Sequence, residues 1–318
     1  MEQTPIITLT LNPALDVSTS VDEVIAEQKL RCASPRFDAG GGGINVSRVI
    51  ARLGGKSLAF AALAGASGAH IKQLLLAEGI DLHAIEAPDI TRESLTVTEG
   101  GTGKQFRFVM PGPTWTEERI AAAINALLLV VPKGALLVVS GSQPPGFPAD
   151  FVLSLTKALQ GKAEVLVDTS GAPLREVAKD DGANLRLLRI DGLEADELAG
   201  HHLTSSEESV AFAASLVARG VAQTAIIARG AEGSVMAAKH GQWLCKAADV
   251  PVISKVGAGD SFMGAFVLAV AQGAEDERAL ASGVAASSAA VMTEATELCR
   301  AADAFALIAE CPVTPIKL

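Results

Sequence analysis

The sequence predicts an α/β protein with a mostly parallel sheet and a small antiparallel β-sheet inserted into it. Two observations indicate this fold class. Short apolar runs alternate with helical stretches through most of the chain, and two other segments alternate apolar and polar residues with a period of two. The 318 residues suffice for about two domains of roughly 150 residues, or for one large domain with an insertion. With 49% hydrophobic and 19% charged residues, the chain is not intrinsically disordered.

The expected strands of the main sheet are β-rich runs at residues 6–11, 135–140, 163–168 and 224–229. Helical stretches lie between them. The segment 44–55 ends in a glycine pair suited to a helix C-cap, and the segment 151–161 repeats apolar residues at every fourth position. Strands that alternate with such helices are typical of βαβ units, in which the helices cover the faces of a parallel sheet.

The inserted sheet is expected from residues 16–38 and 92–111, where apolar and polar residues alternate. The second segment contains Gly-Gly-Thr-Gly at 100–103, which suits a hairpin turn. Both segments return to the α/β pattern, so we interpret them as a lid inserted into one domain. The main α/β domain then comprises residues 1–15, 39–91 and 112–318, and the lid comprises residues 16–38 and 92–111.

Charge and cysteine content exclude several classes of protein. The 36 acidic and 26 basic residues give a net charge of -10, the wrong sign for broad contact with nucleic acid. Any anionic ligand must therefore meet a local basic cluster. The four cysteines lie far apart, without the spacing of a zinc site or a redox pair, and we expect reduced thiols in a cytoplasmic protein. We expect neither a signal peptide nor a membrane-spanning segment.

One glycine-rich segment, Val256 to Phe262, precedes an expected helix. Small residues at Gly257, Ala258 and Gly259 would let backbone N–H groups approach an anion at the positive end of the helix dipole. Asp260 could accept a hydroxyl proton there. The alternative is an ordinary N-cap aspartate after a glycine turn.

A second glycine cluster, Gly40 to Gly43, also precedes an expected helix. Glycine lets main-chain amides contact ligand hydroxyls, and Asn45 offers a donor and an acceptor suited to a polyol. No Lys-Ser or Lys-Thr follows, so the cluster is not a Walker phosphate loop. A flexible loop is the alternative.

These two clusters, at this separation and with an inserted lid, resemble the ribokinase-like (PfkB-type) carbohydrate kinases over nearly the whole chain. The resemblance implies a three-layer α/β/α domain with a β lid. The segment Thr8 to Asp16 is similar to that of the phosphosugar kinases. Lys29 to Cys32, the four consecutive glycines and Arg107 to Gly112 resemble the minor bacterial 6-phosphofructokinases. The lysine that 1-phosphofructokinases usually place within the glycine run is missing.

The expected function is therefore ATP-dependent phosphorylation of fructose 6-phosphate at its C1 hydroxyl, giving fructose 1,6-bisphosphate. The alternatives are 1-phosphofructokinase or tagatose-6-phosphate kinase activity, and a non-catalytic sugar-phosphate sensor. The resemblance also implies Mg²⁺ and a homodimer formed through the lid.

The resemblance assigns roles to individual residues. Asp260 would be the general base, and Gly257, Ala258 and Gly259 would form the anion hole. The sugar would be held by Asp16, Gly41, Gly42, Asn45 and Ser142, and its phosphate by Arg92, with Lys29 and Arg31 reaching across a dimer interface. The nucleotide would be bound by Arg189, Ala228, Gly230, Gly233, Val256, Gly283 and Ser288. The metal would be bound by Asp168, Asp191 and Glu194.

Three of these assignments have structural alternatives. Lys29 and Arg31 could be solvated surface charges on a strand. Asp191 and Glu194 could be an acidic pair at a helix N-terminus that needs no metal. The small residues around Gly283 could serve tight helix packing.

The chain also departs from the family pattern at the expected nucleotide site. Arg189 and Asp191 stand where the branch usually has lysine and asparagine, and Ala228 stands where serine or threonine usually contacts a phosphate. Lys255 replaces a common threonine and could substitute for part of the lost phosphate contact. We expect altered nucleotide affinity or metal preference, because arginine differs from lysine in bulk and geometry. Loss of one neutral hydrogen bond should cost about 0.5–1.5 kcal/mol.

Overall fold

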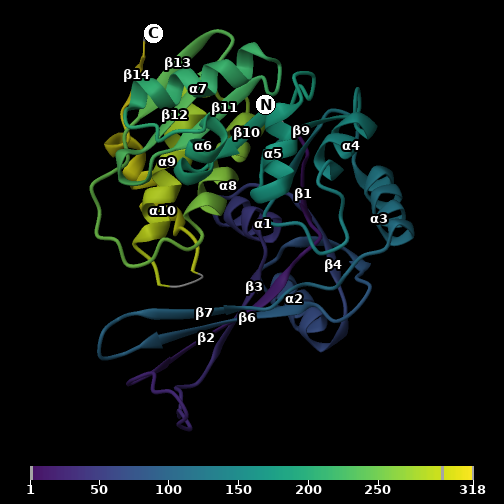
Figure 1. The fold of residues 1–318 in the computed structure, drawn as a ribbon, viewed down its shortest axis with the longest axis vertical. Helices are drawn as coiled ribbons and strands as arrows, with labels where there is room; N and C mark the ends of the chain where they lie inside the picture. Colours follow the sequence, from purple (N-terminus) through teal and green to yellow (C-terminus); the bar gives the residue numbers. More distant parts are fainter. Residues whose placement is uncertain (1–2, 295–296, 317–318) are drawn as a thin grey trace.

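The computed structural model describes residues 3–294 and 297–316, and within them a ten-stranded sheet forms the centre of the molecule (Figure 1). Its strand order is β14-β13-β12-β11-β10-β9-β8-β1-β4-β5. The strands are β1 (Ile6–Thr10), β4 (Leu58–Leu63), β5 (Asp81–Glu86), β8 (Ala135–Ser140), β9 (Ala163–Asp168), β10 (Leu187–Ile190), β11 (Thr224–Ala228), β12 (Ser234–Ala238), β13 (Gly241–Cys245) and β14 (Val313–Pro315).

The strands from β5 to β11 pair in parallel, which confirms the mostly parallel sheet expected from the βαβ pattern. The strands β12, β13 and β14 extend it by antiparallel pairing. The expected strands at 135–140 and 163–168 match β8 and β9, and those at 6–11 and 224–229 each end one residue early.

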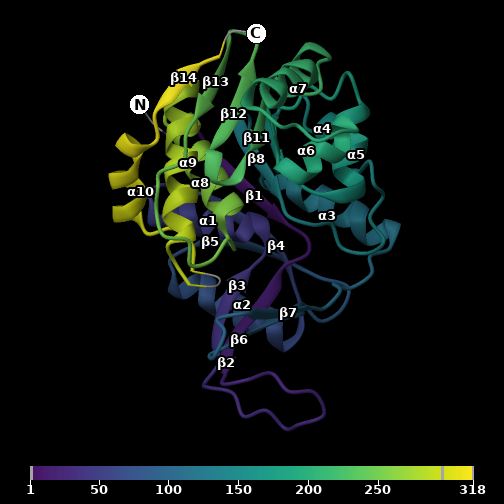
Figure 2. The ribbon, with the colours of Figure 1, turned by 60° about the vertical axis from the view of Figure 1, so that its left-hand side comes forward.

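Helices cover both faces of this sheet. One face is covered by α1 (Gly42–Arg52), α2 (Gly65–Ala77), α8 (Ala258–Ala271) and α9 (Asp276–Val291), with α10 (Ala301–Leu307) against α9. The other is covered by α3 (Glu117–Val130), α4 (Phe151–Ala158), α5 (Gly171–Lys179), α6 (Gly192–Ala199) and α7 (Ser206–Ala218). Figure 2 shows the two helical layers on opposite sides of the strands.

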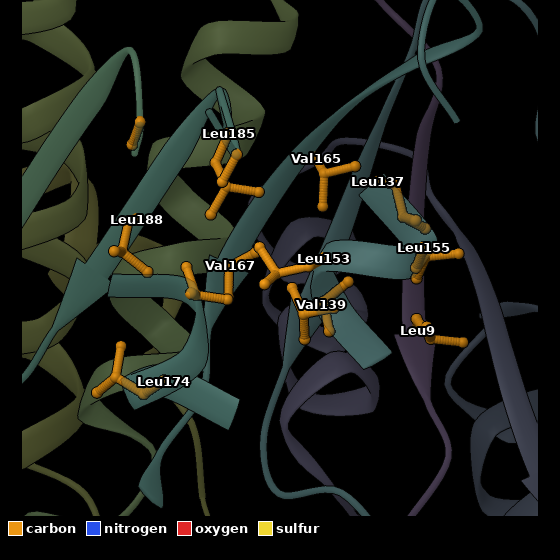
Figure 3. Packing of buried hydrophobic residues seen from close by; sticks show 14 of the residues in the cluster. Leu9, Leu137, Val139, Leu153, Leu155, Val165, Val167, Leu174, Leu185 and Leu188 are labelled. Atoms are coloured by element: carbon orange, nitrogen blue, oxygen red, sulfur yellow. The ribbon is translucent and has the colours of Figure 1, made fainter. Parts of the chain in front are cut away.

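Alternation along the strands divides the core between the two layers. In β8, Leu137 and Val139 point toward α4, whereas Leu136 and Val138 pack with the α8 side. Figure 3 shows the first set meeting residues of β9 and α4. Because side chains alternate with a period of two, Arg189 in β10 points to the α8 side, opposite to its neighbours Leu188 and Ile190.

The second sheet has four strands and extends away from the main body (Figures 1 and 2). It contains β2 (Ala14–Val21), β3 (Arg36–Gly40), β6 (Arg92–Glu99) and β7 (Gln105–Val109) in the order β3-β2-β6-β7. The outer pairs are antiparallel as expected, but the central strands β2 and β6 pair in parallel. The chain enters both central strands from the main domain, which gives them the same direction. The expected hairpin turn at 100–103 joins β6 to β7.

Within residues 3–294 and 297–316, no helix is both long and apolar enough to cross a membrane. The four cysteines have free thiols. Burial raises the pKa of Cys245 to about 12, so this thiol stays protonated at neutral pH.

Candidate active site

Polar residues and glycines gather where the parallel strands end. The strands β1, β8, β9, β10 and β11 direct their carboxyl ends to one edge of the main sheet. At this edge β1 lies between β4 and β8, so the chain leaves β1 toward one side of the sheet and later returns on the other. Ligands of open α/β sheets bind in the crevice outside such a point.

Asp260 lies in the first turn of α8 at this edge. The N-cap is Gly257, with a left-handed φ of 76°, and no side chain of residues 3–294 or 297–316 caps the helix. The alternative of Asp260 as N-cap is therefore wrong. Its carboxylate instead accepts hydrogen bonds from Asn45 Nδ2 at 2.9 Å and from Ser140 Oγ at 3.5 Å. An uncapped helix start leaves backbone N–H groups for an anion.

The surroundings of Asp260 adjust its basicity. Burial raises its pKa from 3.8 to about 6, the hydrogen bond from Asn45 opposes that rise, and the charge of Asp168 adds to it. Arg189 and the Ser140 hydroxyl act in the lowering direction. A carboxylate with this pKa is mostly ionised at neutral pH and is still basic enough to accept a hydroxyl proton.

The glycine run lies in defined structure, so the flexible-loop alternative is wrong. Gly40 ends β3, Gly41 is the N-cap of α1 with a φ of 118°, and Gly42 is the first residue of that helix. A Cβ at Gly40 would lie 2.1 Å from Asp16 Oδ2, and one at Gly42 would lie 2.5 Å from Ser140 Oγ. The backbone therefore packs directly against side chains of the site.

The lid supplies a carboxylate and a cation close to this run. Burial raises the pKa of Asp16 in β2 to about 6, while the charge of Arg92 opposes the rise. Arg92 in β6 donates from Nε and Nη2 to Asn12 O, each at 3.3 Å, and from Nη1 to Met110 O at 3.4 Å. Burial lowers the pKa of Arg92 from its ordinary value. Asp16, Gly41, Gly42, Asn45 and Arg92 thus lie together where strands of the two sheets meet.

Ser142 follows β8 at the same edge and is exposed. Its Oγ accepts a hydrogen bond from Asn12 Nδ2 at 3.2 Å. Asn12 Oδ1 is buried without a partner among the described residues. The Asn12 amide therefore joins the end of β1 to Ser142, and a Cβ at Gly112 would lie 2.1 Å from its oxygen.

Lys29 and Arg31 lie in the loop between β2 and β3, and both are exposed. Within the described part of one chain, neither makes a hydrogen bond or an ion pair. The loop extends from the end of the lid (Figure 2). A single chain therefore does not bring these two cations to the other site residues.

On the far side of Asp260 lies a cavity of about 1020 Å³. The residues expected at the nucleotide, the anion hole or the metal that line it are Arg189, Asp191, Ala228, Gly230, Gly233, Ala258, Gly259 and Ser288. Lys255 also lines it. Val256 and Gly283 do not, and a Cβ at Gly283 would lie 2.9 Å from the ring of Phe262. Gly283 therefore serves the packing of α9 against α8.

Arg189 is held from three sides beside the start of α8. Its Nη1 donates to Asp168 Oδ1 and Oδ2 at 3.1 and 3.0 Å, and its guanidinium lies 5.2 Å from the ring centre of Phe262. Its Nε is buried without a hydrogen bond in the described structure. A Cβ at Gly259 would come within 3.1 Å of Nη1. A fixed cation thus lies beside the expected anion hole.

Asp191 and Glu194 form a capping box at the start of α6. Asp191 Oδ1 accepts from Glu194 N at 2.8 Å, and Glu194 Oε2 accepts from Asp191 N at 3.3 Å. Burial and the charge of Asp191 raise the pKa of Glu194 to about 7. The geometry is that of the alternative, an acidic pair at a helix N-terminus. Asp191 nevertheless lines the cavity as well.

The carboxylates of Asp168, Asp191 and Glu194 do not by themselves form a complete site for a divalent cation. Within residues 3–294 and 297–316, no three metal-ligating side chains cluster. Mg²⁺ commonly binds through one or two carboxylates together with water and substrate phosphates. Asp191 at the cavity and Asp168 beside Arg189 suit that kind of site, although both already accept hydrogen bonds.

Two site residues were missed by sequence reasoning. Arg229 holds the Gly230–Gly233 turn, since its Nη1 donates to Ser205 O at 2.9 Å and its Nη2 to Glu232 Oε2 at 2.7 Å. Arg107 in β7 lowers the pKa of Asp16 by its charge. The sequence signal for Arg229 is its place directly after a strand. Arg107 stands in the Arg107 to Gly112 segment that carries the family resemblance, but only the strand register places it near Asp16.

With this geometry established, comparison with known proteins decides the family. The chain matches the family described as pfkB family carbohydrate kinase over residues 2–302. It belongs to the pfkB family of carbohydrate kinases. The ATP-dependent 6-phosphofructokinase isozyme 2 of Escherichia coli (strain K12) is 37% identical over 295 residues, which cover 92% of this chain and 94% of that protein. The isozyme 2 of Mycobacterium tuberculosis (strain H37Rv) is 36% identical over 299 residues, covering 94% and 87%.

Other pfkB relatives carry a different name. The 1-phosphofructokinase of Borreliella burgdorferi is 30% identical over 288 residues, which cover 90% of this chain and 92% of that protein. This identity is lower than that of the two 6-phosphofructokinases.

Solved structures agree with the pfkB assignment. Phosphofructokinase-2 from Escherichia coli in complex with fructose-6-phosphate superposes with a TM-score of 0.89 at 36% identity, covering 96% of this chain and 98% of that one. Ribokinase from Arabidopsis thaliana superposes with a TM-score of 0.74 at 16% identity, covering 96% and 99%. The fold is therefore ribokinase-like, an α/β/α domain with a small additional sheet.

Proposed function

We propose that this pfkB kinase transfers the γ-phosphoryl group of ATP to the C1 hydroxyl of fructose 6-phosphate, giving fructose 1,6-bisphosphate and ADP. The observation that supports this most is the place of Asp260. It lies between the polar groups of the lid side and the cavity of about 1020 Å³, with the uncapped start of α8 beside it. The two 6-phosphofructokinase relatives, at 36 and 37% identity, support the choice of sugar phosphate.

In this reaction Asp260 accepts the proton of the C1 hydroxyl as the hydroxyl oxygen forms a bond to the γ-phosphorus. The bond from that phosphorus to the β,γ-bridging oxygen breaks, and ADP leaves. The N–H groups of residues 257–259 and the guanidinium of Arg189 stabilise the negative charge of the transferred group. The protein's main contribution is to position the two substrates in line.

At the sugar side, Asp16, Gly41, Gly42, Asn45 and Ser142 would bind hydroxyl groups, and Arg92 would pair with the 6-phosphate. At the nucleotide side the proposed ligands are Arg189, Ala228, Gly230, Gly233, Val256 and Ser288. Val256 does not line the cavity. It directly precedes Gly257, the N-cap of α8, and would act by positioning that helix start. Gly283 would act only by allowing Phe262 to pack.

Mg²⁺ would be held by Asp191 and Asp168 together with the nucleotide phosphates and water. When bound, it supplies charge neutralisation to the triphosphate. Glu194 would support Asp191 through the capping box.

The lid, residues 16–38 and 92–111, is proposed to form a dimer interface through which Lys29 and Arg31 reach the partner's sugar phosphate. Apolar side chains exposed on the lid support this, since Phe37 is 39%, Phe108 is 52% and Val109 is 59% exposed. A tetrameric inhibited form of the Escherichia coli phosphofructokinase-2 is known. A strictly monomeric chain in size-exclusion chromatography with light scattering would remove Lys29 and Arg31 from the site.

The deciding experiment is an ADP-release assay with MgATP and four sugars: fructose 6-phosphate, fructose 1-phosphate, tagatose 6-phosphate and unphosphorylated fructose. We expect the highest kcat/KM with fructose 6-phosphate. Preference for another phosphosugar would keep the mechanism and correct the substrate. Absence of turnover with all four, together with measurable sugar-phosphate binding, would favour a sensor.

A further inference from the structure

Arg48 lies on α1, three residues after Asn45 and on the same face of the helix, and it is only 2% exposed. A charge this deeply buried is costly unless its donors are paired. Nε donates to Glu78 Oε2 at 2.8 Å, Nη2 to Glu78 Oε1 at 2.7 Å, and Nη1 to Ala39 O at 2.9 Å. Nη1 also donates to Asn45 Oδ1 at 3.5 Å. The proposed function gives this buried cation no role.

Through these contacts, the Asn45 amide lies between a cation and an anion. Its Oδ1 faces a guanidinium that can only donate, and its Nδ2 donates to the carboxylate of Asp260, which can only accept when ionised. Turning the amide by half a rotation would direct its NH₂ group at Arg48 and its oxygen at Asp260. Both contacts would then be repulsive, so Arg48 selects the orientation that stabilises the ionised form of Asp260.

The same guanidinium contacts the lid. Ala39 belongs to β3, and Asp38 of that strand has its Oδ1 3.6 Å from Arg48 Nη2. Asp38 lies opposite Asp16 in the β2–β3 register. Glu78, the C-cap residue of α2, holds the other side of the guanidinium. Arg48 therefore connects the strand beside the sugar-site carboxylate with the amide beside the catalytic carboxylate.

We infer that Arg48 is a positioning residue, which holds the Asn45 amide in the orientation that supports Asp260 as base and links that orientation to lid strand β3. The inference rests on the proposed phosphoryl transfer, because it concerns the same site. Arg48 acts through Asn45 and does not itself contact the reacting atoms.

The main test is a double-mutant cycle of Arg48→Met and Asn45→Ala, with kcat and KM measured for the sugar phosphate that the wild type uses. We expect Arg48→Met to lower kcat about ten- to 100-fold. In the Asn45→Ala background it should lower kcat clearly less, because only its contacts with β3 and its charge near Asp16 then remain. Equal losses of kcat in both backgrounds would overturn the inference.

A second readout does not depend on turnover. The titration of the Asp260 carboxyl carbon, followed by carbon-13 NMR and assigned with Asp260→Asn, should move to higher pH in Arg48→Met by about half a unit. The other groups that act on Asp260 are Ser140 from β8, Asp168 from β9 and Arg189 from β10, and the variant leaves all three in place. An unchanged titration would overturn the inference even if the chain phosphorylated none of the sugars. Absence of wild-type turnover would count only against the proposed function.

Arg52 offers a matched control on the same helix. It donates to Leu298 O at 3.0 Å and to Cys299 O at 3.5 Å, and in the described part of the chain it donates to no residue assigned to the sugar or to the base. Arg52→Met should leave kcat and the Asp260 titration unchanged. An equal loss of kcat in this control would show a general effect of disturbing α1 and would contradict the inference.

Arg48→Lys and Glu78→Gln cover the case that Arg48→Met fails to fold. Lysine keeps the charge but lacks the planar fork that reaches Glu78, Ala39 and Asn45 together. We expect Arg48→Lys to restore the thermal unfolding midpoint and to keep most of the loss in kcat. Glu78→Gln should lower kcat less, because Ala39 and Asn45 still hold the guanidinium. Full recovery of kcat with lysine would show that charge alone is needed and would overturn the positioning role.

Discussion

At the sugar side of the site, an added methyl group at Gly40 or Gly42 would collide with Asp16 or Ser140, and the pKa values of Asp16 and Asp260 are both raised to about 6 by burial. The nucleotide side is a cavity of about 1020 Å³. Two of its charged groups pair with their own neighbours, Arg189 with Asp168 at 3.0 Å and Asp191 with the backbone of α6. The sugar side is therefore closely packed, whereas the nucleotide side is open.

This difference explains where the chain departs from its family pattern. The three main changes, Arg189, Asp191 and Ala228, all line the open cavity. There the proposed nucleotide would be held by backbone groups and by several charges, so exchange of one side chain should cost about the free energy of one hydrogen bond. On the packed side the proposed sugar and base residues contact one another directly, and a displacement of 1 Å can cost about 100-fold in rate.

The largest effect is expected from Asp260→Asn. The variant keeps the shape of the side chain but cannot accept the hydroxyl proton, so kcat should fall about 10²- to 10⁴-fold. The dissociation constant for fructose 6-phosphate, measured by calorimetry, should change by less than about threefold. Turnover equal to that of the wild type would remove Asp260 as the base.

The close packing is tested by Gly42→Ala. The new Cβ would lie 2.5 Å from Ser140 Oγ and 2.7 Å from Gly141 N, so β8 and α1 must separate. We expect a loss of about 1–3 kcal/mol in the free energy of unfolding, measured in urea, and a raised KM for the sugar phosphate.

Gly182→Ala is the control for this change. A Cβ there would have its nearest neighbour at 3.5 Å, an ordinary contact, and the residue is exposed. Its stability should change by less than about 0.5 kcal/mol. Similar losses in both variants would contradict the contrast between packed and open regions.

The pH dependence of stability follows from the raised pKa of Asp260. Its folded value of about 6 lies above the ordinary 3.8, so its contribution is fully present below pH 3.8 and is lost as pH rises through 6. Asp260→Asn should therefore unfold at a higher temperature than the wild type at pH 7.5, by a stability gain of about 1–3 kcal/mol, and show about one third of that gain at pH 4.5. Calorimetric scans at the two pH values measure this.

Asp22→Asn, at an exposed lid aspartate, controls for the loss of one negative charge. It should shift the unfolding temperature equally at both pH values. A gain for Asp260→Asn that is the same at pH 4.5 and pH 7.5 would show that burial does not raise the pKa of this carboxyl.

The smallest effect is expected on the open side. Ala228→Ser adds a hydroxyl to the cavity lining and should lower the KM for ATP by about two- to tenfold, equivalent to roughly 0.5–1.5 kcal/mol, with little change in kcat. Ala231→Ser, at an exposed position of the same lining, should leave the KM for ATP unchanged. A raised KM in Ala228→Ser would show that this position makes no phosphate contact.

Local patterns in the sequence were sufficient to predict much of the fold. The strands at 135–140 and 163–168 and the turn at 100–103 follow from apolar periodicity and glycine placement, which involve residues close in the chain. The two glycine clusters were likewise recognisable, because a glycine run before a helix has few local uses. The resemblance built on them led to the pfkB family.

Other features depend on which distant segments meet. The parallel pairing of β2 with β6 joins residues nearly 80 positions apart, and sequence alternation is the same for parallel and antiparallel pairing. The sequence is compatible with Asp191 and Glu194 as metal ligands or as a capping box, and only the backbone of α6 shows that they form a capping box. The sequence is likewise compatible with Gly283 lining a ligand or making room for Phe262, and only the packing of α9 against α8 shows the contact with Phe262.

The sequence by itself determined the alternation of strands and helices, the two glycine-rich helix starts and the carboxylate of Asp260, because these are properties of neighbouring residues. Only the tertiary structure decided that Arg48 is buried between Glu78, Ala39 and Asn45, and that Asn45 in turn reaches Asp260 across 215 positions of the chain. The free energy of a buried charge or amide depends on the partners that folding brings to it, and those partners come from different elements.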